Sequence, residues 1–521
     1  MSSALLAGVH GAVERATEYA LATQLGNGSW CAVPDPRITE TALCTLALAR
    51  SPHPGAGRAV ERGSAWLAAG PDPQRHHPVA HAVESALRSL ALGTGEPVDV
   101  SHAGFADRAL SARARLLQAV ALHAGRPTRG GAEPAALRAQ LATAVASPER
   151  LKRWTQVEVW AAHALVESHF GDRASARHAA LAIADRQSPA GDFFANPVTT
   201  ALAALALRAA APDTAAAGRC DAYLVDSQRP DGTWRFATSD VWDTALTMRV
   251  FGGAAAFGRS ALPGAVAFLV AAQNADGGWP YRSGVESDND TTAAALIALG
   301  GVHAAGLAPD ATIRAGLRHL AGQQLPDGLW RTWQSAGDPP VDDVIAHVVT
   351  ALDRHAGHRI PLAAARDWLA ERLATQGRWR AGWYRGLPYA TAEVLPALGA
   401  AAHEGGHPAA LALAATRNAD GGWPVEAGDP STPAATGLAL AALERGGVHA
   451  HAYWAQGLEY LVKSQRRDGS WPGVPLMYGP RPLLTHFPTQ NHALTADGLF
   501  AGLRRLRAAT APAVAPAREA G

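Results

Sequence analysis

The chain has 521 residues, with 46 basic and 45 acidic side chains and a formal net charge of +1. This length exceeds one ordinary hydrophobic core, so roughly 100 to 200 residues per unit predicts two to four units. The balanced charge provides no basic surface for nucleic acid or for an anionic membrane.

Cysteine usage and the N-terminus bear on the compartment. Cys31, Cys44 and Cys220 lack metal-ligand spacing, and an odd number disfavours a disulfide framework, so a reducing compartment is expected. Residues 1–20 lack the basic start and apolar stretch of a signal peptide, and no run reaches the roughly 18 apolar residues of a membrane span. We expect a cytoplasmic monomer or homodimer without a membrane segment.

A seven-residue pattern recurs along the chain: Gln, three residues, Gly, one residue, and then Trp or Phe. Copies begin at Gln24, Gln187, Gln228, Gln273, Gln324 and Gln465. The copy RNADGGW, from Arg417, lacks only the Gln, and a degraded copy, QGRWRAGW, begins at Gln376. From Gln228 onward the copies are 41 to 52 residues apart, which makes six units in this half of the chain.

Each copy lies between two apolar stretches of helical character, such as TTAAALIALGG from Thr291 and DDVIAHVVTALDRH from Asp342. The Asp-Gly cores of the copies are turn chemistry, and strand signals are scarce. The repeat therefore predicts an all-α fold in which six helix pairs close into an α/α barrel. The second helix of each pair would line the inside and begin at one common cavity.

One inner helix begins with the stretch SDNDTTA, in which Asp288 and Asp290 are one residue apart. Asp and Thr oxygens cap helices, and acidic residues in the first turn complement the helix dipole. A plain N-cap explains this stretch about as well as a functional site does. The barrel geometry nevertheless places both carboxylates at the end of the central cavity.

The repeats resemble the QW motifs of the terpene cyclase and prenyltransferase superfamily. DNDTTA, from Asp288, is similar to the Asp-x-Asp-Asp-Thr-Ala motif with which class II terpene cyclases protonate an alkene, with Thr291 replacing the last Asp. SDVWDTAL, from Ser239, and DPPVDDVIAHVV, from Asp338, are similar to two segments of squalene-hopene cyclase. The Thr291 variant also resembles the Asp-x-Asp-Thr-Thr motif of drimenyl diphosphate synthases.

The resemblance implies two α-barrel domains, called β and γ in the family. It assigns residues 1–35 to a segment that packs with the β domain, 36–215 to the γ domain and 216–506 to the β domain. Residues 507–521, rich in Ala and Pro, are expected to be a disordered tail.

Protonating an unactivated double bond requires a strong acid that still holds its proton at neutral pH. Burial favours the neutral form of a carboxyl group, and two carboxylates at one site do not easily both ionise. We assign Asp290 as the proton donor and Asp288 as its neighbour. By resemblance, Asp343 and His347 fall on the Asp and His that hydrogen-bond to the acid, and their i, i+4 spacing puts them on one helix face. His347 would orient Asp290 and help to reload its proton.

The implied reaction converts farnesyl diphosphate to drimenyl diphosphate, and a copalyl-type reaction of geranylgeranyl diphosphate is the alternative. Aromatic walls would exclude water and stabilise the carbocation. The positions predicted to contact the substrate, chosen mostly near turn-to-helix junctions, are Thr291, Trp242, Asp243, Trp279, Trp333, Trp383, Tyr384, Tyr389 and Phe487. A Trp inside a repeat copy, such as Trp279, is more easily explained as a structural stack.

The diphosphate is expected to stay on the product, because DDVIA from Asp342 lacks the third acid of an ionising Asp-Asp-x-x-Asp cluster. Arg249 and Arg481 are the predicted diphosphate ligands, since Arg suits bidentate contact, against odds of roughly two to one that they are ordinary surface arginines. A weak resemblance in the γ domain implies Mg²⁺ near Glu149 and Glu158.

Three rival functions remain. A protein prenyltransferase β subunit needs a zinc bound by Asp, Cys and His, and the three cysteines do not fit that pattern. In an α/α-barrel glycosidase, Asp288 or Asp290 would pair with Asp343 as acid and base. A non-catalytic scaffold would keep the repeat and leave Asp290 as an exposed cap.

Overall fold

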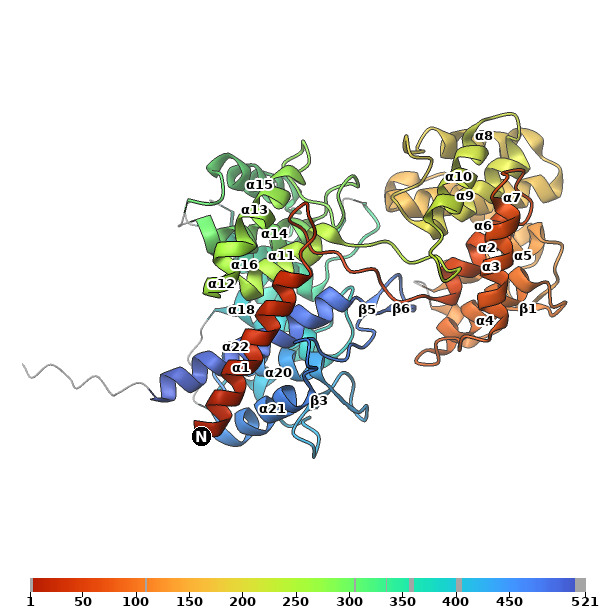
Figure 1. Cartoon of the computed structure of the whole chain (residues 1–521). Coiled ribbons are helices and arrows are strands. Elements are labelled where there is room, and N and C mark those ends of the chain that lie inside the picture. Colours follow the sequence, from red (N-terminus) through yellow and green to blue (C-terminus); the bar gives the residue numbers. More distant parts are fainter. Residues whose placement is uncertain are drawn as a thin grey trace, which may run out of the picture.

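Nearly all of the regular structure is helical. A computed structural model describes residues 3–510, apart from 108–109, 304–305, 334, 356–359 and 400–404 (Figure 1). The described part holds six strands of two residues each: β1 (Val98–Asp99), β2 (Thr128–Arg129), β3 (Trp423–Pro424), β4 (Ser431–Thr432), β5 (Met477–Tyr478) and β6 (Leu484–Thr485). β1 pairs with β2 in parallel, and the other two pairs are antiparallel. The predicted all-α class is confirmed.

The C-terminal barrel is built on a closed ring of six inner helices, each in contact with the next. They are α11 (Asp240–Phe251), α14 (Asn289–His303), α16 (Asp342–Asp353), α18 (Leu387–Leu398), α20 (Pro433–Arg445) and α22 (Pro488–Thr510). The outer layer consists of α1 (Ser3–Ala22), α12 (Ala255–Ser260), α13 (Leu262–Ala271), α15 (Asp310–Gln323), α17 (Ala363–Gln376), α19 (Pro408–Ala414) and α21 (His451–Ser464). The chain's first helix, α1, packs on α21 and α22, and one hydrophobic cluster runs from Val9 to Leu506 (Figure 1).

The N-terminal barrel has its own hydrophobic cluster. Its inner helices are α2 (Ile38–Leu48), α4 (Pro78–Leu92), α5 (Ser111–His123), α7 (Arg153–Phe170) and α9 (Pro197–Ala210), and α9 packs back on α2. Outside them lie α3 (Ala56–Ala68), α6 (Pro134–Val145), α8 (Arg173–Ala184) and α10 (Ala216–Ser227), with 3₁₀ turns η1 (Ala103–Ala106) and η2 (Pro148–Arg150). The chain thus forms the two helical barrels that the resemblance implied.

Two predicted boundaries are wrong. Residues 216–234 do not belong to the C-terminal barrel, because Cys220, Leu224 and Trp234 are buried in the N-terminal cluster. The physical reason is the repeat copy at Gln228, whose side-chain amide donates to the backbone oxygen of Ala59 and ties α10 to α3. The predicted tail 507–521 begins inside α22, which continues to Thr510, and residues 511–521 lie outside the described part of the chain.

The repeat stabilises the fold through two recurring hydrogen bonds. Trp279 Nε1 donates to the backbone oxygen of Leu269, ten residues earlier, over 2.6 Å. The tryptophans that repeat this bond are Trp30, Trp234, Trp330, Trp379, Trp423 and Trp471. Gln273 donates to the backbone oxygens of Gly277 (2.8 Å) and Thr312 (3.0 Å), which joins its turn to the next outer helix. These tryptophans are structural, as expected for Trp residues inside the repeat.

The β5–β6 hairpin connects the two barrels and lies between them in Figure 1. Gln74 of the N-terminal barrel donates to the backbone oxygen of Leu484 (2.8 Å) and accepts from its backbone nitrogen (2.7 Å). The Arg37 guanidinium donates to Thr485 Oγ1 over 2.7 Å. These contacts hold the hairpin over the space between the barrels. None of the helices described here combines the length and the apolar character that crossing a bilayer requires.

Candidate active site

The acid motif forms the first turn of α14. Asp288 accepts hydrogen bonds from the backbone nitrogen of Thr291 (2.6 Å) and from its hydroxyl group (2.9 Å), so these two residues cap the helix. Burial and the nearby charge of Asp290 raise the pKa of Asp288 well above its usual value. The capping interpretation is therefore right for Asp288, and it leaves Asp290 free to face the interior.

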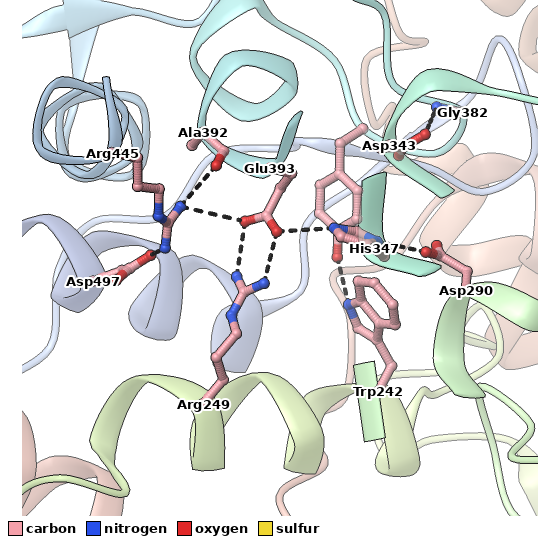
Figure 2. Close-up of polar contacts among 11 residues, drawn as sticks. Trp242, Arg249, Asp290, Asp343, His347, Gly382, Ala392, Glu393, Arg445 and Asp497 are labelled. Atoms are coloured by element: carbon pink, nitrogen blue, oxygen red, sulfur yellow. Dashed lines mark hydrogen bonds and ion pairs between the residues drawn. The ribbon is translucent and has the colours of Figure 1, made fainter. Parts of the chain in front are cut away.

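Asp290 is only 6% exposed and contacts His347 of α16 (Figure 2). Asp290 Oδ1 lies 2.6 Å from His347 Nδ1, and Glu393 Oε2 of α18 lies 2.9 Å from His347 Nε2. Burial opposes a charged imidazole, but the carboxylates of Asp290 and Glu393 outweigh it and raise the pKa of His347 to about 10. The structure thus places the imidazole ring of His347 against the carboxyl group predicted to be the acid, in surroundings that favour its protonated form.

Asp343 is one helical turn before His347 but does not bond to Asp290 as the resemblance implied. Its Oδ1 accepts from the backbone nitrogen of Gly382 over 2.9 Å, and Oδ2 has no hydrogen-bond partner within the described residues. Burial and the charge of Asp290 raise the pKa of Asp343 to about 7. It therefore influences Asp290 by charge and not by contact.

A cavity extends from this acid into the space between the barrels, with an empty volume of about 1300 Å³ that includes the open solvent at its mouth. Its lining is mostly apolar. Asp288, Asp290, Thr291 and Thr332 lie at the C-terminal barrel, whereas Glu40, Arg113 and Glu158 lie at the N-terminal barrel. An apolar chamber with the Asp288 and Asp290 acids at one end, and with the cation Arg113 beside Glu40 and Glu158 at the other, suits a long apolar molecule with a polar head.

Most of the predicted aromatic wall is present. Trp242, Trp333, Trp383, Tyr384 and Phe487 line the cavity, and Thr291 does so as well. Further aromatic residues that the sequence did not single out complete the wall: Trp154, Phe194, Phe236, Tyr281 and Tyr478. No repeat marks these positions, and three of them come from loops that only the pairing of the two barrels brings to the cavity.

Three predicted substrate contacts lie behind the wall. Asp243 is fully buried and accepts from Ser239 (2.9 Å) and Gln490 (2.8 Å). Tyr389 stacks on Tyr384 with 4.0 Å between ring centroids, and Trp279 belongs to the repeat. These side chains shape the wall from behind without lining the cavity.

Neither predicted diphosphate ligand faces the cavity. Arg249 forms a buried bidentate ion pair with Glu393, with Nη1–Oε2 and Nη2–Oε1 distances of 2.6 and 2.8 Å (Figure 2). Arg481 donates to the backbone oxygens of Ala381 (2.6 Å) and Gly382 (3.2 Å). The prediction was wrong because a single sequence cannot show that an arginine is already paired with a distant partner.

The predicted Mg²⁺ ligands do not fit a metal. Glu149 lies exposed in η2, outside the cavity lining, whereas Glu158 is buried, accepts from Thr199 over 3.0 Å and lies 4.0 Å from Arg113. Burial raises the pKa of Glu158, which favours its neutral form. The residues that the structure describes contain no group of three or more His, Cys, Asp or Glu arranged to hold a metal ion.

Two cations near the cavity were not predicted from the sequence. Arg113, on α5, is the one Arg or Lys among the described lining residues. Lys152, one of two lysines in the chain, lies behind the wall, 3.2 Å from Asp338. Its ammonium nitrogen is 4.9 Å from the ring centroid of Trp383 and 5.7 Å from that of Trp333. It braces the aromatic wall by cation–π contact.

Comparison with known proteins agrees with this geometry. The profile of the squalene-hopene cyclase C-terminal domain matches residues 198–338 and 333–480. The chain belongs to this family, and the predicted resemblance to class II terpene cyclases is confirmed.

Several relatives share the family. A drimenyl diphosphate synthase of Streptantibioticus cattleyicolor is 33% identical over 346 residues, covering 61% of this chain and 63% of the relative. One of Streptomyces showdoensis is 33% identical over 300 residues, covering 56% and 48%. The chain thus spans less than two-thirds of the length of these curated relatives.

One solved structure shares the fold over almost the whole chain. The ent-copalyl diphosphate synthase of Streptomyces platensis has a TM-score of 0.54 with 18% sequence identity, covering 94% of this chain and 99% of that structure. At this identity the similarity establishes the arrangement of helices and not the reaction.

Proposed function

We propose that this chain is a class II terpene cyclase that converts farnesyl diphosphate to bicyclic drimenyl diphosphate. The observation that carries the proposal is the 2.6 Å contact between Asp290 and His347 at the end of an apolar cavity. A buried carboxyl group beside an imidazolium can give up a proton and leave a stabilised carboxylate. The two drimenyl diphosphate synthases that match this chain support the choice of substrate.

The reaction is an isomerisation. Asp290 gives its proton to a carbon of the terminal double bond, whose π electrons form the new C–H bond and leave a carbocation. The two remaining double bonds each close one ring, and the bicyclic cation then loses one proton to form the final double bond. Trp242, Tyr384 and Trp333 line the cavity around this path, where their π faces stabilise positive charge and exclude water.

The diphosphate takes no part in the bond changes and remains on the product. Asp342 of the DDVIA stretch accepts hydrogen bonds from Arg372 Nε (3.2 Å) and from the backbone nitrogen of Arg380 (2.8 Å). Asp343 accepts one from the backbone nitrogen of Gly382. These acids are therefore unsuited to holding the metal ions of an ionising synthase. In our proposal the diphosphate instead lies toward Arg113, whose fork of N–H donors suits phosphate oxygens.

Two acids near Arg113 are compatible with an anionic head. Glu40 is paired with Arg37, with Arg37 Nε 3.0 Å from Glu40 Oε2, and Glu158 is held toward its neutral form by burial. The apolar lining disfavours a glycosidase, because sugar sites expose polar groups in an open groove. The burial of Asp290 disfavours a non-catalytic scaffold, which would leave this residue as an exposed cap.

Incubation with farnesyl diphosphate and, separately, with geranylgeranyl diphosphate tests the proposal. We expect drimenol by mass analysis of the farnesyl reaction only after phosphatase treatment, and a smaller yield from the C20 substrate. Asp290→Asn should lower the rate by at least about 10²–10⁴-fold. Asp367→Asn, an exposed change on α17, is the matched control and should leave it unchanged. An active, folded Asp290→Asn variant, or free drimenol without phosphatase, would overturn the assignment.

A further inference from the structure

His347 lies between two carboxylates that come from different helices (Figure 2). Its Nδ1 is 2.6 Å from Asp290 Oδ1 and its Nε2 is 2.9 Å from Glu393 Oε2. An ionised carboxylate only accepts hydrogen bonds, and a neutral imidazole has one N–H group. Once Asp290 has given up its proton, both contacts are satisfied together only when both ring nitrogens carry a proton. No motif in the sequence pointed to Glu393, which lies in the apolar helix α18.

Glu393 is held as an anion by a second layer of charge. Arg249 of α11 binds both of its oxygens, at 2.6 and 2.8 Å, and Arg445 of α20 lies 4.0 Å from Oε1. Arg445 is itself fixed by Asp497 (2.6 Å) and by the backbone oxygen of Ala392 (3.0 Å). Burial disfavours the charge, but Arg249 and His347 hold the pKa of Glu393 well below its usual value.

We propose that the Glu393–Arg249 ion pair is a positioning device that keeps His347 protonated on both nitrogens and directs its Nδ1–H at Asp290. This inference rests on the proposed function only in assigning the proton transfer to Asp290. The charge state of His347 can be measured without substrate and does not depend on that function. Glu393 acts through His347 and does not touch the cavity, because it is absent from the lining.

The charged groups around His347 show how the Glu393–Arg249 ion pair affects Asp290. Asp290 on α14 and Glu393 on α18 contact the ring, and Asp343 on α16 acts on it by charge. Behind Glu393 lie Arg249 on α11, Arg445 on α20 and, bound to Arg445, Asp497 on α22. The hydroxyl groups of Tyr384 and Tyr389 interact electrostatically with Asp290 and Glu393. Arg249 neutralises Glu393, so the imidazolium charge is left to Asp290. It stabilises the carboxylate that remains there after the proton has gone to the substrate.

Glu393→Gln tests the device, because glutamine keeps the shape and the hydrogen-bond acceptor but removes the charge. The pKa of His347, about 10 in the parent, should fall, and the neutral ring should then appear within the working pH range. For Glu393→Gln we expect kcat near the parent value at about pH 6 and at least roughly tenfold lower at about pH 9, with KM little changed. The kcat of the parent should vary by less than about threefold between these two pH values.

The matched control is Glu444→Gln, which removes the charge from another Glu that binds an Arg in bidentate fashion. Glu444, at the C-terminal end of α20, pairs with Arg504 at 2.7 and 2.6 Å in a partly exposed ion pair, and the pH profile of this variant should match the parent. Glu393→Asp keeps the charge and should restore the parent profile at a reduced rate. A purely structural Glu393 would lower activity at every pH alike.

Nitrogen NMR of the parent, with the His347 signal identified by its loss in His347→Gln, gives a second readout that needs no substrate. We expect two protonated ring nitrogens at about pH 8. A neutral ring there, or a folded Glu393→Gln variant with the parent pH profile, would overturn the inference even if the chain cyclises farnesyl diphosphate. Should Glu393→Gln fail to fold, the protonation of His347 in the parent spectrum decides. An active Asp290→Asn variant would instead defeat the proposed function while the His347 charge state remained measurable.

Discussion

The indole Nε1 of Trp242 donates a hydrogen bond to the hydroxyl oxygen of Tyr384 over 2.9 Å, and that hydroxyl donates to Gln490 Oε1 over 2.6 Å. Gln490 in turn donates to Ser239 and Asp243. The ring of Trp242 lies 5.9 Å from that of His347, so this chain of bonds fixes an aromatic face beside the acid. A cyclase of the kind proposed needs such a face held rigidly, because the cation forms next to it.

Tyr384→Phe should disturb both stability and product. Without the hydroxyl, the Trp242 N–H and the Gln490 oxygen lose their buried partner, which costs about 1–3 kcal/mol of unfolding free energy. The freed Trp242 ring should also broaden the product mixture, measured by mass analysis after dephosphorylation. Tyr453→Phe removes a hydroxyl from the outer helix α21 and serves as the control. A single unchanged product from Tyr384→Phe would show that this bond does not position the wall.

The barrel and the acid pair could be predicted from the sequence because short local patterns specify both. The repeat at Gln273 specifies its own turn, and His347 lies in a stretch similar to one in squalene-hopene cyclase. Glu393 and Arg249 could not be predicted as partners, because closure of the helix ring brings together residues 144 positions apart. For the same reason Arg249 was mistaken for a diphosphate ligand.

Asp243→Asn should make the stability of the protein less sensitive to pH. Burial raises the pKa of Asp243 to about 7, above the roughly 3.9 of an unfolded aspartate. A raised folded pKa means that the contribution to stability is full below the unfolded pKa and is lost as pH rises to about 7. An asparagine does not ionise, so the variant avoids this loss.

Urea unfolding of both proteins at about pH 5 and pH 8 measures this effect. The variant should gain about 1 to 3 kcal/mol relative to the parent between the two conditions, whatever the offset at the lower pH. Asp367→Asn, on the surface of α17, should show no such change. An equal difference at both pH values would mean that Asp243 is already ionised in the folded protein across the whole range.

The copy of the repeat at Arg417 should accept a glutamine. Arg417 Nη1 donates to the backbone oxygen of Ala452 over 3.0 Å, in the way that Gln273 donates to Thr312. We therefore expect Arg417→Gln to change the unfolding free energy by less than about 0.5 kcal/mol. Gln273→Ala, which leaves two backbone oxygens without their donor, should cost about 1–3 kcal/mol. Equal costs for the two changes in urea unfolding would show that the bond between neighbouring outer helices is not what the glutamine contributes.

Arg113→Gln should separate the diphosphate end of the cavity from the acid end. Arg113 lines the cavity at the N-terminal barrel and is the one cation in the described lining, whereas Asp290 lies at the opposite barrel. A charge-assisted hydrogen bond to phosphate contributes about 1.5–3 kcal/mol, so KM should rise roughly 10- to 100-fold while kcat changes little.

Inhibition by inorganic diphosphate gives the same site a test without turnover. We expect the inhibition constant to rise in Arg113→Gln and to stay unchanged in Arg75→Gln, whose side chain is exposed at the surface. Loss of the ion pair with Glu158 should not by itself unfold the variant, since burial already favours the neutral form of that carboxyl group. If diphosphate inhibited both variants as it does the parent, the head group would have to lie elsewhere. Lys152, behind Trp333 and Trp383, would then be the next cation to change.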